Sequence, residues 1–184
     1  MAIYKPSIEE RQSEAEKQYK LDTKDKKDIC KLLSLALKKG NIQGHVLVKN
    51  PNEIDFDKIS SEYETNNASD IIFIQFTENG HIAVVGAGKD LAFSKNKSRG
   101  TWRVISTIKG IEWDTETVIV IPVQNIKNCR IVTGENLLEY RNGVEQYLGD
   151  YLISNNVPIL NYYQHKNCSD GFWDKCKGKN YIIC

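Results

Sequence analysis

Six basic residues gather between Gly86 and Ile111, where a single aspartate opposes them, so this segment carries a local charge of +5. The six are Lys89, Lys95, Lys97, Arg99, Arg103 and Lys109. Lysine and arginine on a glycine-punctuated loop are suited to a phosphate backbone, because each contact releases counterions at little steric cost. Trp102, Phe93 and Trp113 lie in or near the same segment and have flat faces on which a base could stack. The pattern predicts nucleic-acid binding.

A plainer interpretation of the segment stays open. A lysine-rich loop is usually only solvated, and a tryptophan in a strand usually belongs to the core. The preceding stretch from Asn50 to Asp70 has six acidic residues against one lysine, so charge is divided along the chain. A basic loop of this kind would also suit a protein-interaction domain with an acidic partner.

The C-terminal tail contains four residues that could bind a metal ion. His165, Cys168, Cys176 and Cys184 supply the number of nitrogen and sulfur ligands that a tetrahedral structural zinc site needs. The tail has no Cys-x-x-Cys pair, which would place two thiolates on one turn. Free thiols are therefore the competing interpretation of the same residues.

Several enzyme motifs are missing from the chain. Gly86-x-Gly88-Lys89 lacks the rest of a phosphate-binding loop, and no Gly-x-Ser-x-Gly nucleophile motif occurs. Asp70 begins an apolar strand in the way a metal-dependent nuclease needs, but no Glu-x-Lys pair follows on the next strand. These absences argue against nucleotide hydrolysis and acyl transfer.

The overall composition is that of an ordinary globular domain. The 184 residues are 40% hydrophobic and 27% charged, with a net charge of +1. No apolar run approaches the roughly 18 to 20 residues of a membrane span, and the first 21 residues have no signal-peptide pattern. We therefore expect a cytoplasmic protein with no membrane partner; the oligomeric state is left open.

The hydrophobic periodicity divides the chain into helices at both ends and strands between them. Ser7 and Glu10 have the spacing of a capping box, and apolar residues recur at helical spacing from Ile29 to Leu37 before Gly40. A second helical stripe runs from Leu137 to Leu152. Strands are expected over residues 45–49, 70–76, 81–87, 101–108 and 117–123, with a hairpin turn at residues 77–80.

Four strand motifs follow one another in the middle of the chain: His45-Val46-Leu47-Val48, Ser69-Asp70-Ile71-Ile72-Phe73, Ile82 to Gly86, and Trp102-Arg103-Val104. Their order resembles the PUA-like superfamily, in particular its EVE and ASCH-type modules, over roughly His45 to Val123. This resemblance implies a small β-barrel that holds a modified or flipped base in an aromatic-lined pocket. Carried over to this chain, the resemblance places Phe76 in the site together with Trp102 and the basic residues.

A hairpin with Ile72-Phe73 and Val84-Val85-Gly86 is followed, much later, by Glu145 and by Pro158-Ile159-Leu160-Asn161. This second pattern resembles the GIY-YIG nucleases. Phe73 and Val84 stand where that family has tyrosines, so its proton-transfer chemistry would have to be rebuilt. The resemblance implies Mg²⁺-dependent cutting of DNA with Glu145 as the metal ligand and His165 as a further catalytic residue.

Together these patterns predict an α+β fold with a small antiparallel β-barrel or strongly curved sheet, flanked by N-terminal and C-terminal helices. We expect an N-terminal helical segment over residues 1–44, a β-rich core over 45–127, and a C-terminal helix and tail over 128–184, packed as one domain. The expected function is binding of DNA or RNA without a cofactor. A Mg²⁺-dependent endonuclease is the alternative, and zinc in the tail would be structural.

Overall fold

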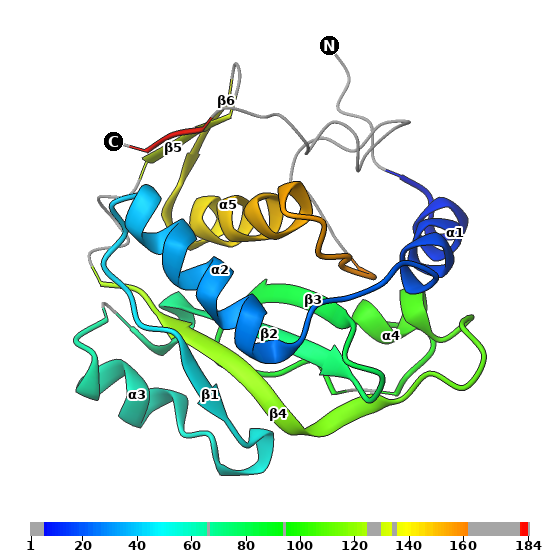
Figure 1. The fold of residues 1–184 in the computed structure, drawn as a ribbon. Helices are drawn as coiled ribbons and strands as arrows, with labels where there is room; N and C mark the ends of the chain where they lie inside the picture. The colour runs from blue at the N-terminus through cyan, green and yellow to red at the C-terminus, as the bar shows by residue number, and fades with distance from the viewer. Residues whose placement is uncertain are drawn as a thin grey trace.

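The computed structural model describes residues 6–65, 67–93, 95–124, 130–133, 136–161 and 181–183. The fold is α+β, as expected, with one antiparallel sheet of four strands and helices around it (Figure 1). In chain order the elements are α1 (Ile8–Tyr19), α2 (Lys26–Lys39), β1 (Leu47–Lys49), η1 (Pro51–Glu53), α3 (Phe56–Glu62), η2 (Ala68–Asp70), β2 (Ile71–Thr77), β3 (Ile82–Ala87), α4 (Gly100–Ile105), β4 (Trp113–Pro122), β5 (Arg130–Thr133), β6 (Asn136–Glu139), α5 (Tyr140–Ser154) and β7 (Tyr181–Ile183).

The four-stranded sheet has the order β1-β4-β2-β3, and each neighbouring pair is antiparallel. All seven residues of β2 are buried, which confirms the expectation of a strand covered on both faces. The predicted hairpin joins β2 to β3, and Gly80 in its turn has a positive φ of 81°. The sheet is open, with β1 and β3 as its outer strands, so the expected barrel is not confirmed.

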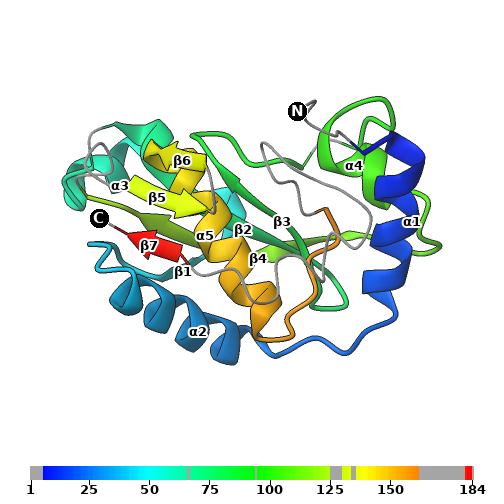
Figure 2. The same cartoon turned by 90° about the horizontal axis from the view of Figure 1, so that it is seen from above.

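Helices α2 and α5 cover one face of this sheet (Figures 1 and 2). Ile29 and Leu33 of α2 and Leu148 of α5 are fully buried there against alternate side chains of β2. Tyr147 of α5 joins the two helices directly, because its hydroxyl donates a hydrogen bond of 2.8 Å to the carbonyl oxygen of Ala36. This layer is the larger part of the hydrophobic core.

The opposite face is covered by different elements along its length. Helix α3 packs Ile59 against Ile71 and Phe73 of β2. Toward the other end of the sheet, α1 and α4 enclose a second cluster that includes Ala15 and Trp113. Figure 2 shows α1 and α4 beside one another, away from α2 and α5.

The two N-terminal helices begin and end as their sequences indicate. Ser7 and Glu10 form the predicted capping box at the start of α1. Gly40 is the C-cap of α2, as expected, but the left-handed backbone angle belongs to Asn41, whose φ is 50°.

Two secondary-structure predictions are wrong. Residues 101–108 were expected to form a strand, but the chain forms helix α4 from Gly100 to Ile105. The C-terminal helix begins at Tyr140, and the two preceding leucines, Leu137 and Leu138, lie in strand β6. Strands β5, β6 and β7 form a second small sheet in the order β6-β5-β7, which the sequence pattern did not indicate. Among the described residues, no helix has the length and hydrophobicity needed to cross a membrane.

Candidate functional site

The six cations of the basic segment all lie on the surface. They occupy the loop from β3 to α4, helix α4 itself and the turn after it. These residues are Lys89, Lys95, Lys97, Arg99, Arg103 and Lys109. The structure therefore brings five of the seven predicted nucleic-acid-binding residues, all of them basic, to one exposed segment.

The loop is fixed to the sheet at several points. The backbone N–H of Gly88 donates a hydrogen bond of 3.0 Å to the carbonyl oxygen of Ile71. Leu91 packs on the cluster formed by α3 and β2. The next residue, Ala92, donates its backbone N–H to the side-chain Oε1 of Gln75 at 2.6 Å. Phe93 then meets Trp113 edge to face, with the ring centroids 5.7 Å apart. The sheet thus positions the first part of the loop, residues 88–93, which contains Lys89.

Acidic neighbours divide these cations into two groups. Lys95 is paired with Glu112, and its ammonium lies 5.8 Å from the centroid of the Trp102 ring. Arg103 lies near Glu9, and its charge is a minor influence on that carboxylate: hydrogen bonds from the backbone and from Ser7 mainly lower the pKa of Glu9. Among the described residues, the other four basic residues form no ion pair: Lys89, Lys97, Arg99 and Lys109.

The two aromatic members of the predicted site lie inside the protein. Phe76 is fully buried in the core with α2 and α5, on the face of the sheet away from the basic loop. Trp102 is 7% exposed and packs on Trp113, with the two ring centroids 5.9 Å apart. Neither ring is placed to stack on a base at the surface. Phe93 is the half-buried aromatic side chain of the loop.

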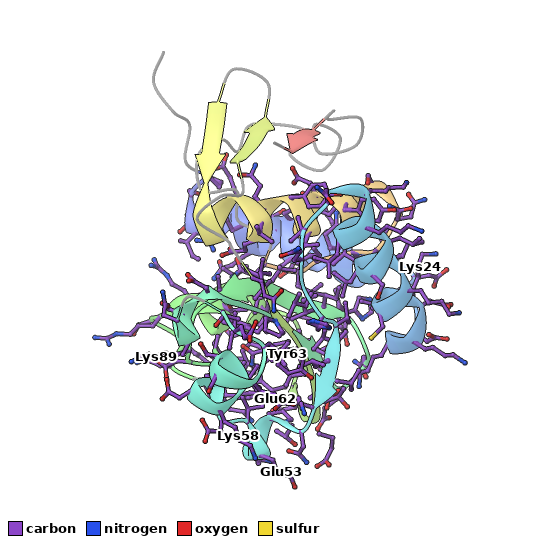
Figure 3. All side chains as sticks on the ribbon, turned by 90° about the vertical axis from the view of Figure 1, so that its left-hand side faces the viewer. Lys24, Glu53, Lys58, Glu62, Tyr63 and Lys89 are labelled. Carbon is purple, nitrogen blue, oxygen red and sulfur yellow. The ribbon has the colours of Figure 1, made fainter. Side chains whose placement is uncertain are left out.

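A second set of lysines escaped the sequence analysis. Lys24, before α2, and Lys27 and Lys38, within it, are exposed. Lys27 and Lys38 are eleven residues apart, about three helical turns, and this spacing was the signal in the sequence. In Figure 3, Lys24 and Lys89 lie on opposite sides of the molecule, so the lysines of α2 form a surface distinct from the basic segment.

The acidic stretch noted in the sequence lies around helix α3. Figure 3 shows Glu53 and Glu62 on this part of the surface, with Lys58 among them. Asp55 caps α3 by accepting a hydrogen bond of 2.9 Å from the backbone N–H of Lys58. The face of the sheet that carries the basic loop therefore also carries an acidic region, which limits how far an anionic polymer could extend toward α3.

No protein-family model matches this chain, and no curated protein or solved structure matches it. Any assignment of function therefore depends on the surfaces and buried groups of the chain itself.

The residues of the nuclease and zinc hypotheses do not form a site in the part of the chain that the structure describes. Glu145 is half-buried on α5, and His165, Cys168, Cys176 and Cys184 lie outside the described residues. Within the described ranges, no group of three or more His, Cys, Asp or Glu residues could hold a metal ion. The described thiol is Cys30, and burial raises its pKa.

Asn161, at the end of the GIY-YIG-like motif, links three parts of the fold. Its side-chain oxygen accepts a hydrogen bond of 2.7 Å from Arg11 of α1, and its side-chain nitrogen donates one of 2.9 Å to Thr101 of α4. Its backbone N–H donates to the carbonyl oxygen of Ala83 in β3 at 2.9 Å. The contacts of this asparagine are those of a structural residue.

Proposed function

We propose that this protein binds nucleic acid through the phosphate backbone, using the exposed cations of the β3–α4 loop and of α4. The observation that carries the proposal is the set of four cations without an ion-pair partner among the described residues: Lys89, Lys97, Arg99 and Lys109. A basic side chain that is not paired with a carboxylate can bind a phosphate without first breaking an ion pair within the protein.

The anchoring of the loop favours this proposal over the interpretation that the loop is only solvated. The hydrogen bonds from Gly88 and Ala92 to β2 limit the conformational entropy that the first part of the loop, around Lys89, loses on binding. Contacts to phosphates fix position but carry no sequence information, so this surface would bind nucleic acid with little sequence preference. Recognition of a modified or flipped base by a PUA-like pocket stays a prediction, and Trp102 and Phe76 would have to be exposed to take part in it.

The proposal is tested by two variants that remove the same charge from different surfaces. The first changes Lys89, Lys97 and Arg99 to Ala, and the second changes Lys24, Lys27 and Lys38 to Ala. Binding to single- and double-stranded oligonucleotides is measured by fluorescence anisotropy over a series of salt concentrations. We expect the loop variant to lose roughly 10- to 100-fold in affinity and to reduce the slope of log K against log salt by about 2 to 3.

The remaining outcomes identify the alternatives. Equal losses in both variants would mean that only net charge matters, and a loss confined to the second variant would move the site to α2. Wild-type protein that binds neither form of oligonucleotide would overturn the proposal and leave an acidic protein as the expected partner. Mg²⁺-dependent fragments of plasmid DNA that disappear with Glu145→Ala would instead establish the endonuclease alternative.

A further inference from the structure

Two buried hydrogen-bond donors beneath the basic loop have no acceptor among the residues that the structure describes. Gln75 is 1% exposed and Trp113 is 2% exposed. Within the described ranges, neither the side-chain Nε2 of Gln75 nor the indole Nε1 of Trp113 has a hydrogen-bond partner. A buried donor without a partner forfeits the hydrogen bonds it would make with water, so each such group in a folded protein calls for an explanation.

Gln75 and Trp113 lie on adjacent strands of the sheet. Gln75 of β2 pairs with Val118 of β4, and Thr77, two residues farther along β2, pairs with Trp113. The register shifts between Gln75 and Thr77, so the chain of β4 bulges between these two pairs. The loop that contacts both side chains is what places them near one another.

The loop touches these two residues in succession. Ala92 donates its backbone N–H to Gln75, and the adjacent Phe93 packs on Trp113. Because Ala92 and Phe93 are only half-buried, a thin layer of chain separates the donors from solvent. The side chains that carry the two donors thus contact two successive residues of the basic segment.

The hydrogen-bonding groups of Gln75 and Trp113, and the charges near them, indicate the class of ligand. The Oε1 of Gln75 already accepts a hydrogen bond from Ala92. Among the described residues, the groups of these two side chains that have no partner are therefore both N–H donors. The ammonium of Lys95 is paired with Glu112 and lies over Trp102, which packs on Trp113. Two donors next to a cation-rich loop suit a ligand with several anionic oxygen acceptors.

We infer that Gln75 Nε2 and Trp113 Nε1 bind two oxygen atoms of a phosphate group beneath residues 92 and 93. The phosphate is either the free inorganic ion or the terminal phosphate of a nucleotide strand. This inference stands apart from the proposed function, because it concerns the buried donors and not the exposed cations.

The experiment follows the indole N–H signals of protein labelled with ¹⁵N-tryptophan. The chain has three tryptophans, and Trp113→Phe and Trp102→Phe assign their signals. Inorganic phosphate is titrated against potassium chloride of equal ionic strength. We expect a saturable downfield shift of the Trp113 indole proton with phosphate and none with chloride.

Gln75→Glu is the decisive variant. The carboxylate keeps an oxygen to accept from Ala92 but loses the Nε2 donor and adds a negative charge, so phosphate affinity should fall at least ~10-fold. Gln43→Glu adds the same charge at an exposed position in the α2–β1 connection and should leave the affinity unchanged. If Gln75→Glu does not fold, the wild-type comparison of phosphate with chloride still decides the matter.

Two further oligonucleotide titrations identify the source of the phosphate. A short single strand with a 5′-phosphate that shifts Trp113 at lower concentration than inorganic phosphate would assign the site to a strand terminus. A shift with inorganic phosphate alone would assign it to the free ion. An unmoved Trp113 signal in every titration would overturn the inference and leave a trapped water as the acceptor. A shift that Gln75→Glu does not weaken would overturn it as well.

The failure of this inference is distinguishable from failure of the proposed function. The variant lacking Lys89, Lys97 and Arg99 tests the exposed surface through oligonucleotide affinity. The Trp113 signal with inorganic phosphate tests the buried donors, and either result can be positive when the other is negative.

Discussion

The ring of Phe73 lies so close to Gly86 that a Cβ atom on that glycine would stand 2.5 Å from the Cζ atom of the ring. The two residues are paired in register across β2 and β3. Gly86 does not have a positive φ, so the need for glycine here comes from the ring and not from backbone strain. This contact fixes the end of β3 just before the basic loop begins.

Gly86→Ala should therefore lower the free energy of unfolding by about 1 to 3 kcal/mol, because the Phe73 ring must leave its place. Urea denaturation measures the loss. Phe73→Leu in the same chain removes the obstructing ring, so the double variant should lose less than the sum of the two single losses. Additive losses would show that the ring is not what excludes a side chain at position 86.

The hydrogen bond between Gln75 and Ala92 should control the exchange of one amide. Gln75→Leu removes the acceptor, so the Ala92 amide proton should exchange with solvent at least roughly tenfold faster, in line with the loss of a hydrogen bond worth about 1.4 kcal/mol. Hydrogen exchange followed by NMR gives the rate. Gln75→Glu, which retains an oxygen acceptor, should keep the protection. Equal exchange rates in the wild type and both variants would show that this hydrogen bond does not hold the loop.

Helix α4 shows why part of the fold could not be predicted. Trp102 and Val104 alternate with Arg103, a pattern typical of a strand. The buried positions Thr101, Val104, Ile105 and Ile108 equally satisfy helical spacing, and a segment this short does not separate the two periods. In the structure this segment is a helix whose buried side chains, Val104 and Ile105, pack in one cluster with Ala15 of α1. By contrast, β2 was predictable because its sequence is almost continuously apolar, and α2 because it has a long stripe of apolar residues at helical spacing.

The site was predictable in its charges but not in its partners. The run of lysines and arginines indicated a surface segment, and the structure places them there. That Glu112 neutralises Lys95 depends on the turn after α4, which the sequence did not position. Gln75 could have been noticed, since it is the polar interruption of an apolar strand, and Trp113 was noted only as an aromatic near the loop.

The ion pair between Lys26 and Asp114 should contribute more to stability than a surface pair. Asp114 is buried, and its other oxygen accepts from the backbone N–H groups of Glu116 and Thr117 at 2.8 and 3.0 Å. Lys26→Met leaves this carboxylate without its cation and should cost about 1 to 3 kcal/mol, since Lys26 itself is about one-third exposed. Urea denaturation at two salt concentrations measures the cost.

Lys31→Met is the matched control for that measurement. Lys31 is an exposed lysine of the same helix, paired with Asp28 at 2.7 Å, and the hydrogen bond between them lowers the pKa of Asp28 and raises the pKa of Lys31. Water solvates both groups, so removing the lysine should change stability little. A loss as large as that of Lys26→Met would contradict the distinction between the two pairs.

Tyr147 should make stability fall at high pH. Burial, with a smaller effect of the neighbouring Tyr151, raises the pKa of Tyr147 from 10.0 to about 12. Below pH 10 the hydroxyl is protonated in both the folded and the unfolded chain, so its contribution is complete. Between pH 10 and 12 the unfolded chain releases this proton while the folded chain keeps it, and the free energy of unfolding therefore decreases.

Comparison with Tyr147→Phe isolates this effect from the titration of lysines and other tyrosines. The variant loses the hydrogen bond to Ala36, so at pH 8 it should be less stable by ~1 kcal/mol. As the pH rises to about 12 the wild type should lose that advantage and a further ~1 to 2 kcal/mol, because only the wild type has a proton to lose at this position. Urea denaturation of both proteins across this range gives the difference, and the near-ultraviolet absorbance of tyrosinate gives the titration itself. A difference in stability that stays constant with pH would show that Tyr147 ionises as freely in the folded chain as in the unfolded one.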